Sequence, residues 1–207
     1  MTFRMVTCIV SALLSLLIYG LAAFGASDTK YLDGIEAGNE LINKDPNDFS
    51  GYASRGCSYS YLKKYKLAET DLLKAISLKP DEAGLYAHLA DVYSSTKKYG
   101  QALTASRKVI ELGIRTEHSY NALIANLCLS NHFDECLSKC DDIILQYPTD
   151  AFAYFYRAIC KNELNSFSKN QVLADLLKAH MLKPEDEGFK RLYEQALAGK
   201  SIKLIRR

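Results

Sequence analysis

Residues 49–82 read FSGYASRGCSYSYLKKYKLAETDLLKAISLKPDE, and the remainder of the chain repeats the pattern of this stretch. Its apolar and small residues recur at steps of three and four, at Tyr52, Gly56, Tyr59, Ala68, Leu72, Ala75 and Ile76. This period predicts two amphipathic helices rather than strands. Residues 62–65 form a short polar break, so the two helices should run antiparallel. Gly56 and Ala68 are small, and we expect the helix axes to come closest there.

The same pattern recurs with a period of 34 residues. The aromatic position is occupied by Tyr52, Tyr86, Tyr120 and Tyr154. A core position is occupied by Ala68, Ala102 and Cys136, and prolines separated by one or two periods stand at Pro46, Pro80 and Pro148. Because several registers keep the same phase, the sequence predicts a stack of similar units, each a pair of helices.

These positions resemble the tetratricopeptide repeat, whose pattern has an aromatic residue, a leucine–glycine pair, a tyrosine, an alanine, a large apolar residue and a closing proline. The second copy, for example, carries Tyr86, Leu89, Ala90, Tyr93, Ala102 and Val109 at these places. The departures are Ile114 at the second proline, Arg55 and Arg157 at the leucine, and two additional residues in the fourth copy, which we place in the turn at residues 165–170. The resemblance implies an all-α, right-handed superhelical solenoid with a general role in binding.

The domain organisation follows from this period. About four helical hairpins are predicted, at residues 49–82, 83–116, 117–150 and 151–184. Residues 28–48 hold a helix in phase with the second helix of a copy, and we expect it to cap the N-terminal end of the stack. Residues 185–207 hold a C-terminal capping helix and a basic tail, which is either a frayed end or a contact with an anionic membrane surface or partner.

Residues 1–27 have a basic start at Arg4, an apolar run and small residues near Gly25, as in a secretory signal peptide. The apolar run is also close to the length of about 20 residues that spans a bilayer. Residues 5–24 could therefore be an uncleaved membrane anchor, and a buried N-terminal helix is a third alternative. The first two interpretations predict an exported protein (periplasm, secreted or secretory-pathway lumen) or an anchored one with its repeats on the non-cytoplasmic side.

Five cysteines follow Cys8, and an odd number leaves at least one thiol outside any disulfide in an exported protein. Cys128, His132, Cys136 and Cys140 are each four residues apart, which on one helix would form a stripe of zinc or haem ligands. The repeat phase places a turn at residues 131–133, which breaks this stripe. Cys136 and Cys140 fall in core positions, so we expect them to pack there. A disulfide such as Cys128–Cys160 and a metal site remain alternatives.

Catalytic and nucleic-acid-binding functions find little support in the sequence. It contains no glycine-rich phosphate loop, no G-x-S-x-G and no H-E-x-x-H motif, and its four histidines are scattered. The formal net charge of +2 does not indicate nucleic acid as a partner. We therefore predict no enzymatic activity, no metal, no cofactor and no nucleic-acid partner.

In tetratricopeptide-repeat proteins the first helices of successive units line a concave groove, and the resemblance implies that a protein or peptide partner binds there. By phase, the groove-facing residues are Ser54, Cys57, Tyr61, His88, Asp91, Ser95, Asn121, Ala125, Phe152, Phe155, Tyr156 and Ile159. The Lys/Asn cluster with which chaperone-binding members hold a C-terminal carboxylate is absent, since Ala53, Ala87 and Cys57 stand in its place. The aromatic side chains of the fourth copy either pack on the next helix or form a site for a helix or an extended peptide.

Three functions are compatible with these features. The first is a non-enzymatic scaffold or adaptor of the cell envelope or secretory pathway that binds a protein partner in the groove. The second is a structural or assembly subunit held at the membrane by residues 5–24. The third is a metal- or haem-binding carrier, which no complete set of ligands in the sequence supports.

Overall fold

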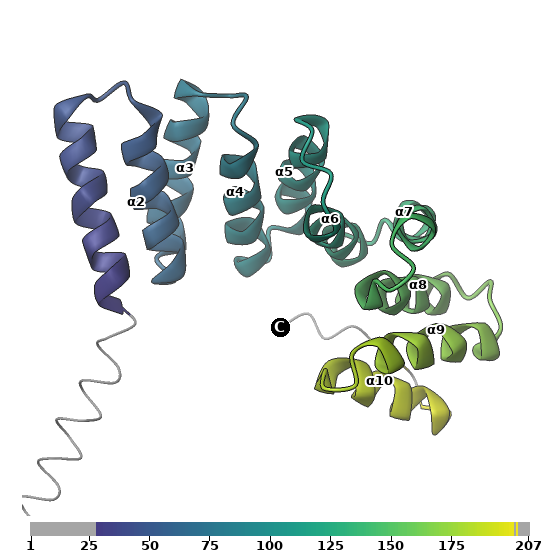
Figure 1. Cartoon of the computed structure of the whole chain (residues 1–207). Helices are drawn as coiled ribbons and strands as arrows, with labels where there is room; N and C mark the ends of the chain where they lie inside the picture. The colour runs from purple at the N-terminus through teal and green to yellow at the C-terminus, as the bar shows by residue number, and fades with distance from the viewer. Residues whose placement is uncertain (1–27, 201, 203–207) are drawn as a thin grey trace, which may run out of the picture. The chain divides into compact units, whose positions relative to one another are not determined.

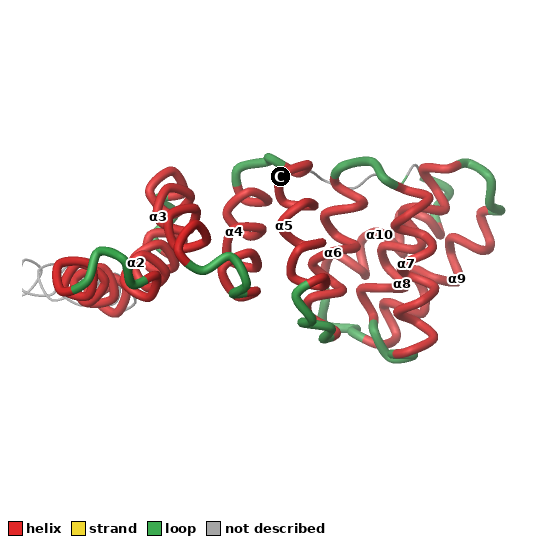
Figure 2. Tube along the Cα trace, turned by 90° about the horizontal axis from the view of Figure 1, so that it is seen from above, coloured by secondary structure: helices red, strands yellow, loops and turns green. Residues whose placement is uncertain are grey.

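The computed structural model describes residues 28–200 and residue 202 (Figure 1). The predicted signal peptide or anchor at residues 1–27 lies outside the described residues, as do residues 201 and 203–207 of the basic tail. Within the described part of the chain every regular element is a helix, so the predicted all-α fold is confirmed (Figure 2).

Residues 28–44 are helical. The helices that follow are α2 (Phe49–Tyr61), α3 (Tyr65–Leu78), α4 (Ala83–Ser95), α5 (Tyr99–Glu111), α6 (Glu117–Leu129), α7 (Phe133–Gln146), α8 (Ala151–Leu164), α9 (Lys169–Leu182) and α10 (Glu187–Leu197). Helix α2 packs on α3, α4 on α5, α6 on α7 and α8 on α9. The helical hairpins therefore begin where the 34-residue period places them.

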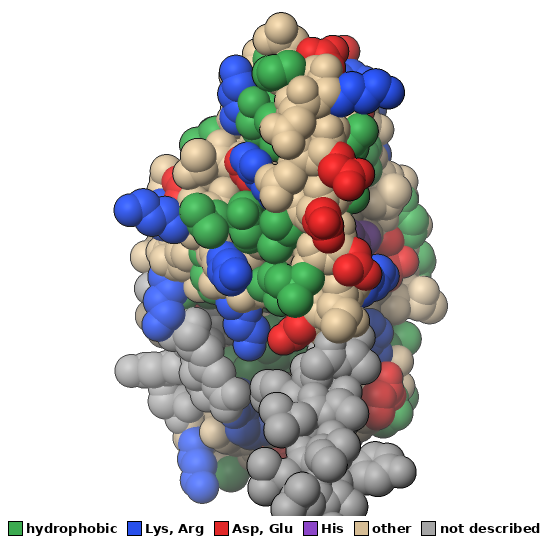
Figure 3. Space-filling model, turned by 90° about the vertical axis from the view of Figure 1, so that its left-hand side faces the viewer, with side chains coloured by type: hydrophobic (Ala, Val, Ile, Leu, Met, Phe, Trp, Pro, Cys, Tyr) green, Lys and Arg blue, Asp and Glu red, His purple; other side chains and the backbone are tan. Residues whose placement is uncertain are grey.

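The chain forms two compact units, residues 1–80 and 81–207. In the first unit the helix at residues 28–44 lies against α2 with little space between them. A Cβ atom at Gly38 would lie 2.7 Å from the Cβ atom of Arg55 and 2.9 Å from the carbonyl oxygen of Gly51. On this helix Leu32 and Leu41 are exposed, and Figure 3, which faces this side of the molecule, shows hydrophobic side chains gathered on it. Its role as a cap remains a prediction.

The predicted close approach of α2 and α3 is present in the same unit. A Cβ atom at Gly56 would lie 3.1 Å from side-chain atoms of Asp71 and Leu72. Ala68, Leu72 and Ala75 on α3 are fully buried. A larger residue at position 56 would therefore separate the two helices.

In the second unit the helices α5–α10 contribute to one core, and the hairpin of α6 and α7, the third of the chain, departs from the others. One position of the period is occupied by a small residue in the other copies, at Gly56, Ala90 and Ala158, and by Ile124 in the hairpin of α6 and α7. Ile124 is fully buried, and α6 packs less extensively on α7 than the helices of the other hairpins do on each other. The larger side chain at the contact between the two helices explains the difference.

The last copy closes through the longer turn that the sequence predicts. Asn165 has the same left-handed geometry as Lys63, three periods earlier, and α9 begins at Lys169. The two additional residues therefore lie between Asn165 and Lys169, within the predicted turn at residues 165–170. The tail is not frayed at Ile202, whose side chain is buried in the core with Phe189 and Leu192 of α10. The carbonyl oxygen of Ile202 accepts a hydrogen bond from Nδ2 of Asn162 at 3.2 Å.

Candidate binding groove in the second unit

The first helices α4 and α6 are connected by a chain of polar side chains, two of which are buried. Ser94 on α4 donates a hydrogen bond to Oδ1 of Asn126 on α6 at 2.7 Å, and Nδ2 of Asn126 donates to Ser106 on α5 at 2.9 Å. Asn126 and Ser106 are almost completely buried, where a hydrogen bond is worth most because an unpaired group is costly. The repeat pattern did not predict this network. A signal for it was present in the sequence, because the polar Ser106 stands in the core position that Leu72 occupies in the first copy.

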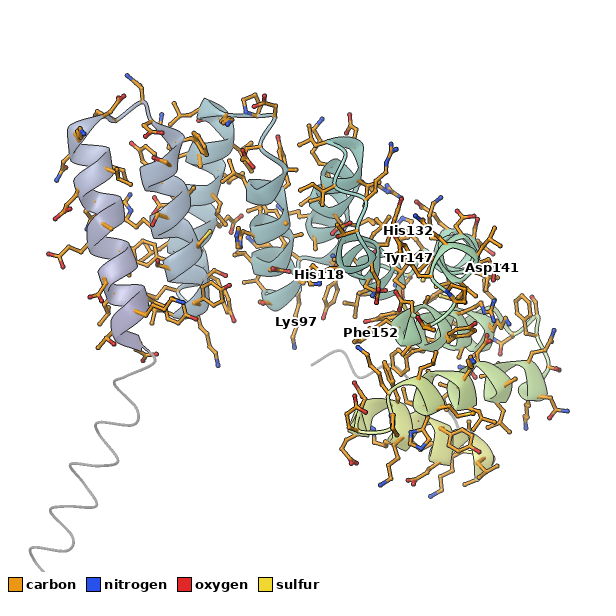
Figure 4. The ribbon with its side chains drawn as sticks, viewed as in Figure 1. Lys97, His118, His132, Asp141, Tyr147 and Phe152 are labelled. Carbon is orange, nitrogen blue, oxygen red and sulfur yellow. The ribbon has the colours of Figure 1, made fainter. Side chains whose placement is uncertain are left out.

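On the inner face of these helices three titratable side chains lie together. His88 and Asp91 come from α4 and His118 from α6. The Asp91 side chain is exposed, but the protein atoms around it displace part of the water near its carboxyl and raise its pKa, a shift that the two histidines partly oppose. His118 was not predicted, but it stands one period before Phe152, which was. Figure 4 shows His118 and Phe152 on the inner side of this unit, and His132 and Asp141 on its outer side.

Asn121, a predicted groove residue on α6, carries an unused hydrogen-bond acceptor. Its Oδ1 atom is buried, and no described residue donates a hydrogen bond to it. Buried polar atoms in folded proteins are almost always paired, so an exception requires an explanation. Asn121 contrasts with Asn126 on the same helix, which is paired through both its Oδ1 and Nδ2 atoms.

The aromatic wall predicted on α8 is largely covered by α10. The ring of Phe155 lies 4.6 Å from that of Phe189, and the ring of Phe152 lies 5.2 Å from it. Phe155 and Ile159 are buried, so their assignment to the groove surface is wrong. Phe155 packs on α10, and Ile159 belongs to the core of the unit. Burial of aromatic and aliphatic area against α10 is the physical reason. Phe152 and Tyr156 remain half-buried.

The predicted groove residues of the first unit contact the helix at residues 28–44. Ser54 donates a hydrogen bond to the carbonyl oxygen of Gly34 at 3.4 Å, and the ring of Tyr61 stacks on that of Tyr31 at 4.6 Å. Burial raises the pKa of the Cys57 thiol to about 11, which keeps it protonated at neutral pH. Ser54 and Cys57 are half-buried, whereas Tyr61 is exposed.

Cys136 and Cys140 are fully buried, as their core positions predict. The five cysteines of the described residues are present as thiols. Within the same residues no group of His, Cys, Asp and Glu side chains is arranged to hold a metal ion. A cavity of about 390 Å³ lies beside Asn162, Phe167 and Ile202, away from the predicted groove residues. None of the helices that the structure describes is long and apolar enough to cross a membrane.

The sequence model of the tetratricopeptide-repeat family matches residues 49–82 and 83–112. Residues 49–112 therefore contain two tetratricopeptide repeats. Solved structures of such proteins share the fold. YrrB, a tetratricopeptide-repeat protein with an unusual peptide-binding site, has a TM-score of 0.64 and 17% identity over 80% of this chain and 84% of that chain. MamA from Desulfovibrio magneticus RS-1 has a TM-score of 0.68 and 13% identity over 83% of this chain and 96% of that chain.

TTC0263, a protein of Thermus thermophilus, has a TM-score of 0.59 and 16% identity over 89% of this chain and 96% of that chain. No curated protein matches the sequence. The tetratricopeptide repeats recognised by the family model end before the third hairpin. That hairpin has Ile124 where the other copies have glycine or alanine, and the fourth has the longer turn, so both depart from the family pattern.

Proposed function

We propose that this protein is a non-enzymatic tetratricopeptide-repeat scaffold that binds a protein or peptide partner on the inner face of α4 and α6. The observation that carries the proposal is the contrast between two asparagines of α6. Asn126 is used for packing, whereas the buried Oδ1 atom of Asn121 has no donor among the described residues. Because the Asn121 side chain as a whole is only half-buried, a rotation of its amide group would present Oδ1 to a backbone N–H group of an extended peptide.

Other features of this face support the same function. His118 lies one turn before Asn121 on α6 and close to Asp91 of α4, and Phe152 and Tyr156 of α8 add partly exposed aromatic area. The network of Ser94, Ser106 and Asn126 holds α4, α5 and α6 in place, which lowers the conformational entropy lost on binding. The peptide-binding site of YrrB, a protein of the same fold, is consistent with this use.

The proposal includes the location of the protein. The apolar run at residues 5–24 supports export, or anchoring with the repeats on the non-cytoplasmic side. The length of this apolar run, close to the length of about 20 residues that spans a bilayer, is the observation that favours a second candidate, a membrane-held assembly subunit. The intact mass of the protein from its native cell separates the two, because a cleaved signal peptide removes these residues and an anchor retains them.

The experiment that tests the groove separates binding from stability. Peptides that bind the full-length protein are selected from a random peptide library, and their affinities are measured for the wild type and for Asn121→Ala. We expect Asn121→Ala to weaken binding about tenfold, or about 1.4 kcal/mol, while the free energy of unfolding stays the same or rises. Loss of an acceptor that has no donor in the unbound protein removes no stabilising contact.

Two matched variants complete this design. Asn126→Ala should lower stability, because it leaves Ser94 and Ser106 without a shared partner. Asn170→Ala, on the exposed start of α9, should change neither property. Equal affinity of the selected peptides for the wild type and Asn121→Ala would contradict binding at this face.

A further inference from the structure

Four of the five cysteines in the described residues meet where α6, α7 and α8 pack together. Cys128 comes from α6, Cys136 and Cys140 from α7, and Cys160 from α8. All four are at most 1% exposed. The repeat pattern explains Cys136 and Cys140 as core residues, but it requires no cysteine at Cys128 or Cys160, where the other copies carry serine, valine or asparagine.

The thiols of this cluster touch one another. Cys160 is within hydrogen-bonding range of Cys128 and Cys136, and Cys136 is within range of Cys128, Cys140 and Cys160. Cys136 also donates a hydrogen bond to the carbonyl oxygen of Ile124 at 3.4 Å. The contact between Cys128 and Cys160 therefore joins side chains of two first helices, α6 and α8.

The preceding junction shows what these two positions do in this fold. Cys128 lies one period after Ser94, and Cys160 lies one period after Asn126. Ser94 and Asn126 join α4 to α6 through a hydrogen bond of 2.7 Å. The equivalent side chains at the next junction therefore point at each other, and both are thiols.

We propose that Cys128 and Cys160 form a disulfide that joins α6 to α8 under oxidising conditions. The reaction is thiol–disulfide exchange with a disulfide such as oxidised glutathione. The thiolate of Cys128 attacks one sulfur of the reagent, forms a mixed disulfide and releases one reduced glutathione. The thiolate of Cys160 then attacks the Cys128 sulfur and releases the second, so two protein thiols are oxidised and one reagent disulfide is reduced.

Burial controls when this reaction occurs. Hydrogen bonds to Cys128 and Cys136, together with burial, raise the pKa of the Cys160 thiol, and only the thiolate attacks a disulfide. The exchange therefore takes place while the junction is transiently open or before folding is complete. The α6–α7 hairpin, which packs less extensively than the others, is where opening is easiest. The proposed export would bring the chain to a compartment in which disulfides persist.

The bond would also affect the binding face. Asn121 lies on α6, and Phe152 and Tyr156 lie on α8. A covalent link between these helices fixes their spacing, and it restricts the unfolded chain. The oxidised protein should therefore unfold at a higher temperature than the reduced one.

The test uses the full-length wild-type protein, incubated with oxidised glutathione and then denatured and treated with iodoacetamide. We expect the mass of the protein before alkylation to fall by two hydrogen atoms, two fewer cysteines to be alkylated, and one cross-linked peptide pair to contain Cys128 and Cys160. Cys128→Ser and Cys160→Ser should each abolish the cross-link, whereas Cys57→Ser and Cys140→Ser should retain it.

The peptide map of the wild type decides the proposal even if a serine variant fails to fold. Alkylation of every cysteine, a stable mixed disulfide with glutathione, or a cross-link that contains Cys136 would each overturn it. A protein whose unfolding temperature is the same after formation of the Cys128–Cys160 bond would contradict the stated effect on α6 and α8.

Discussion

At the scale of single residues, the turn within each hairpin contains a residue with left-handed backbone geometry. These residues are spaced by one period and are Lys63, Lys97, Asn131 and Asn165, with φ of 58°, 61°, 64° and 53°. In the first hairpin the N–H of Lys63 bonds to the carbonyl of Ser60, and the N–H of Lys64 bonds to that of Tyr59. This is the Schellman arrangement, which favours glycine at the left-handed position.

We expect Lys63→Gly to stabilise the first unit by about 1 kcal/mol, because a residue with a Cβ atom is strained in the left-handed region and glycine is not. The free energy is measured by urea unfolding. Lys64→Gly is the matched control, because Lys64 is also exposed but has φ of −83°. The Lys64→Gly variant should have the same free energy of unfolding as the wild type or a lower one. A loss of stability in Lys63→Gly would show that the side chain of Lys63 matters more than its backbone geometry.

At the scale of elements, two arginines connect neighbouring helices at equivalent places. Arg55 on α2 binds both carboxylate oxygens of Asp71 on α3 at 2.7 and 2.8 Å, and it reaches Asn39 on the preceding helix at 2.7 Å. Arg157 on α8 binds Asp175 on α9 at 3.0 and 2.6 Å and Asp141 on α7 at 2.8 Å. The sequence showed these arginines only as departures from leucine. The structure shows that each joins three helices.

In the second copy Leu89 and Ala105 occupy the positions of Arg55 and Asp71. An apolar pair can therefore replace the ion pair in this fold, which predicts the behaviour of variants. Arg55→Leu should destabilise α2 and α3 by about 3 kcal/mol, because Asp71 is left as a buried charge without its partner. The double variant Arg55→Leu, Asp71→Ala should recover most of this loss. Hydrogen exchange of α2 and α3 measures both energies. A double variant as unstable as Arg55→Leu alone would show that the unpaired carboxylate is not the cause.

At the scale of the whole molecule, the array is stabilised by contacts between neighbouring repeats, and its last apolar face must be covered. Ile202 covers part of that face, since its side chain is only 4% exposed. Leu197 on α10, by contrast, is 61% exposed and therefore contributes little to covering this face. The tail is therefore structural at Ile202, although its composition also suggested a contact with a membrane or partner.

We expect Ile202→Asp to lower the stability of α8, α9 and α10 by about 3 kcal/mol, because it places a charged group in an apolar core. Hydrogen exchange should become faster in these helices and stay the same in residues 28–80, since repeat arrays transmit destabilisation mainly to their neighbours. Leu197→Asp is the control and should have little effect. Equal loss of protection along the whole chain would contradict nearest-neighbour stabilisation.

The sequence by itself determined the helices, the hairpins and the core positions of this protein. Two helices of one hairpin are close in the chain, so their packing is encoded by local spacing, and a period of 34 residues repeats that code. The predicted burial of Ala68, Ala102, Cys136 and Cys140 is confirmed for this reason. Asp91 and Asn121 were also placed on the candidate face by phase alone.

Only the tertiary structure decided how one copy meets the next and which surface remains open. Phase placed Phe155 and Ile159 in the groove, but Phe189 of α10 supplies apolar area that buries Phe155. The bond between Ser94 and Asn126 and the contact of Cys128 with Cys160 each join residues 32 positions apart. Such contacts depend on the relative orientation of successive hairpins, which arises when their side chains pack together and which the period of a sequence does not specify.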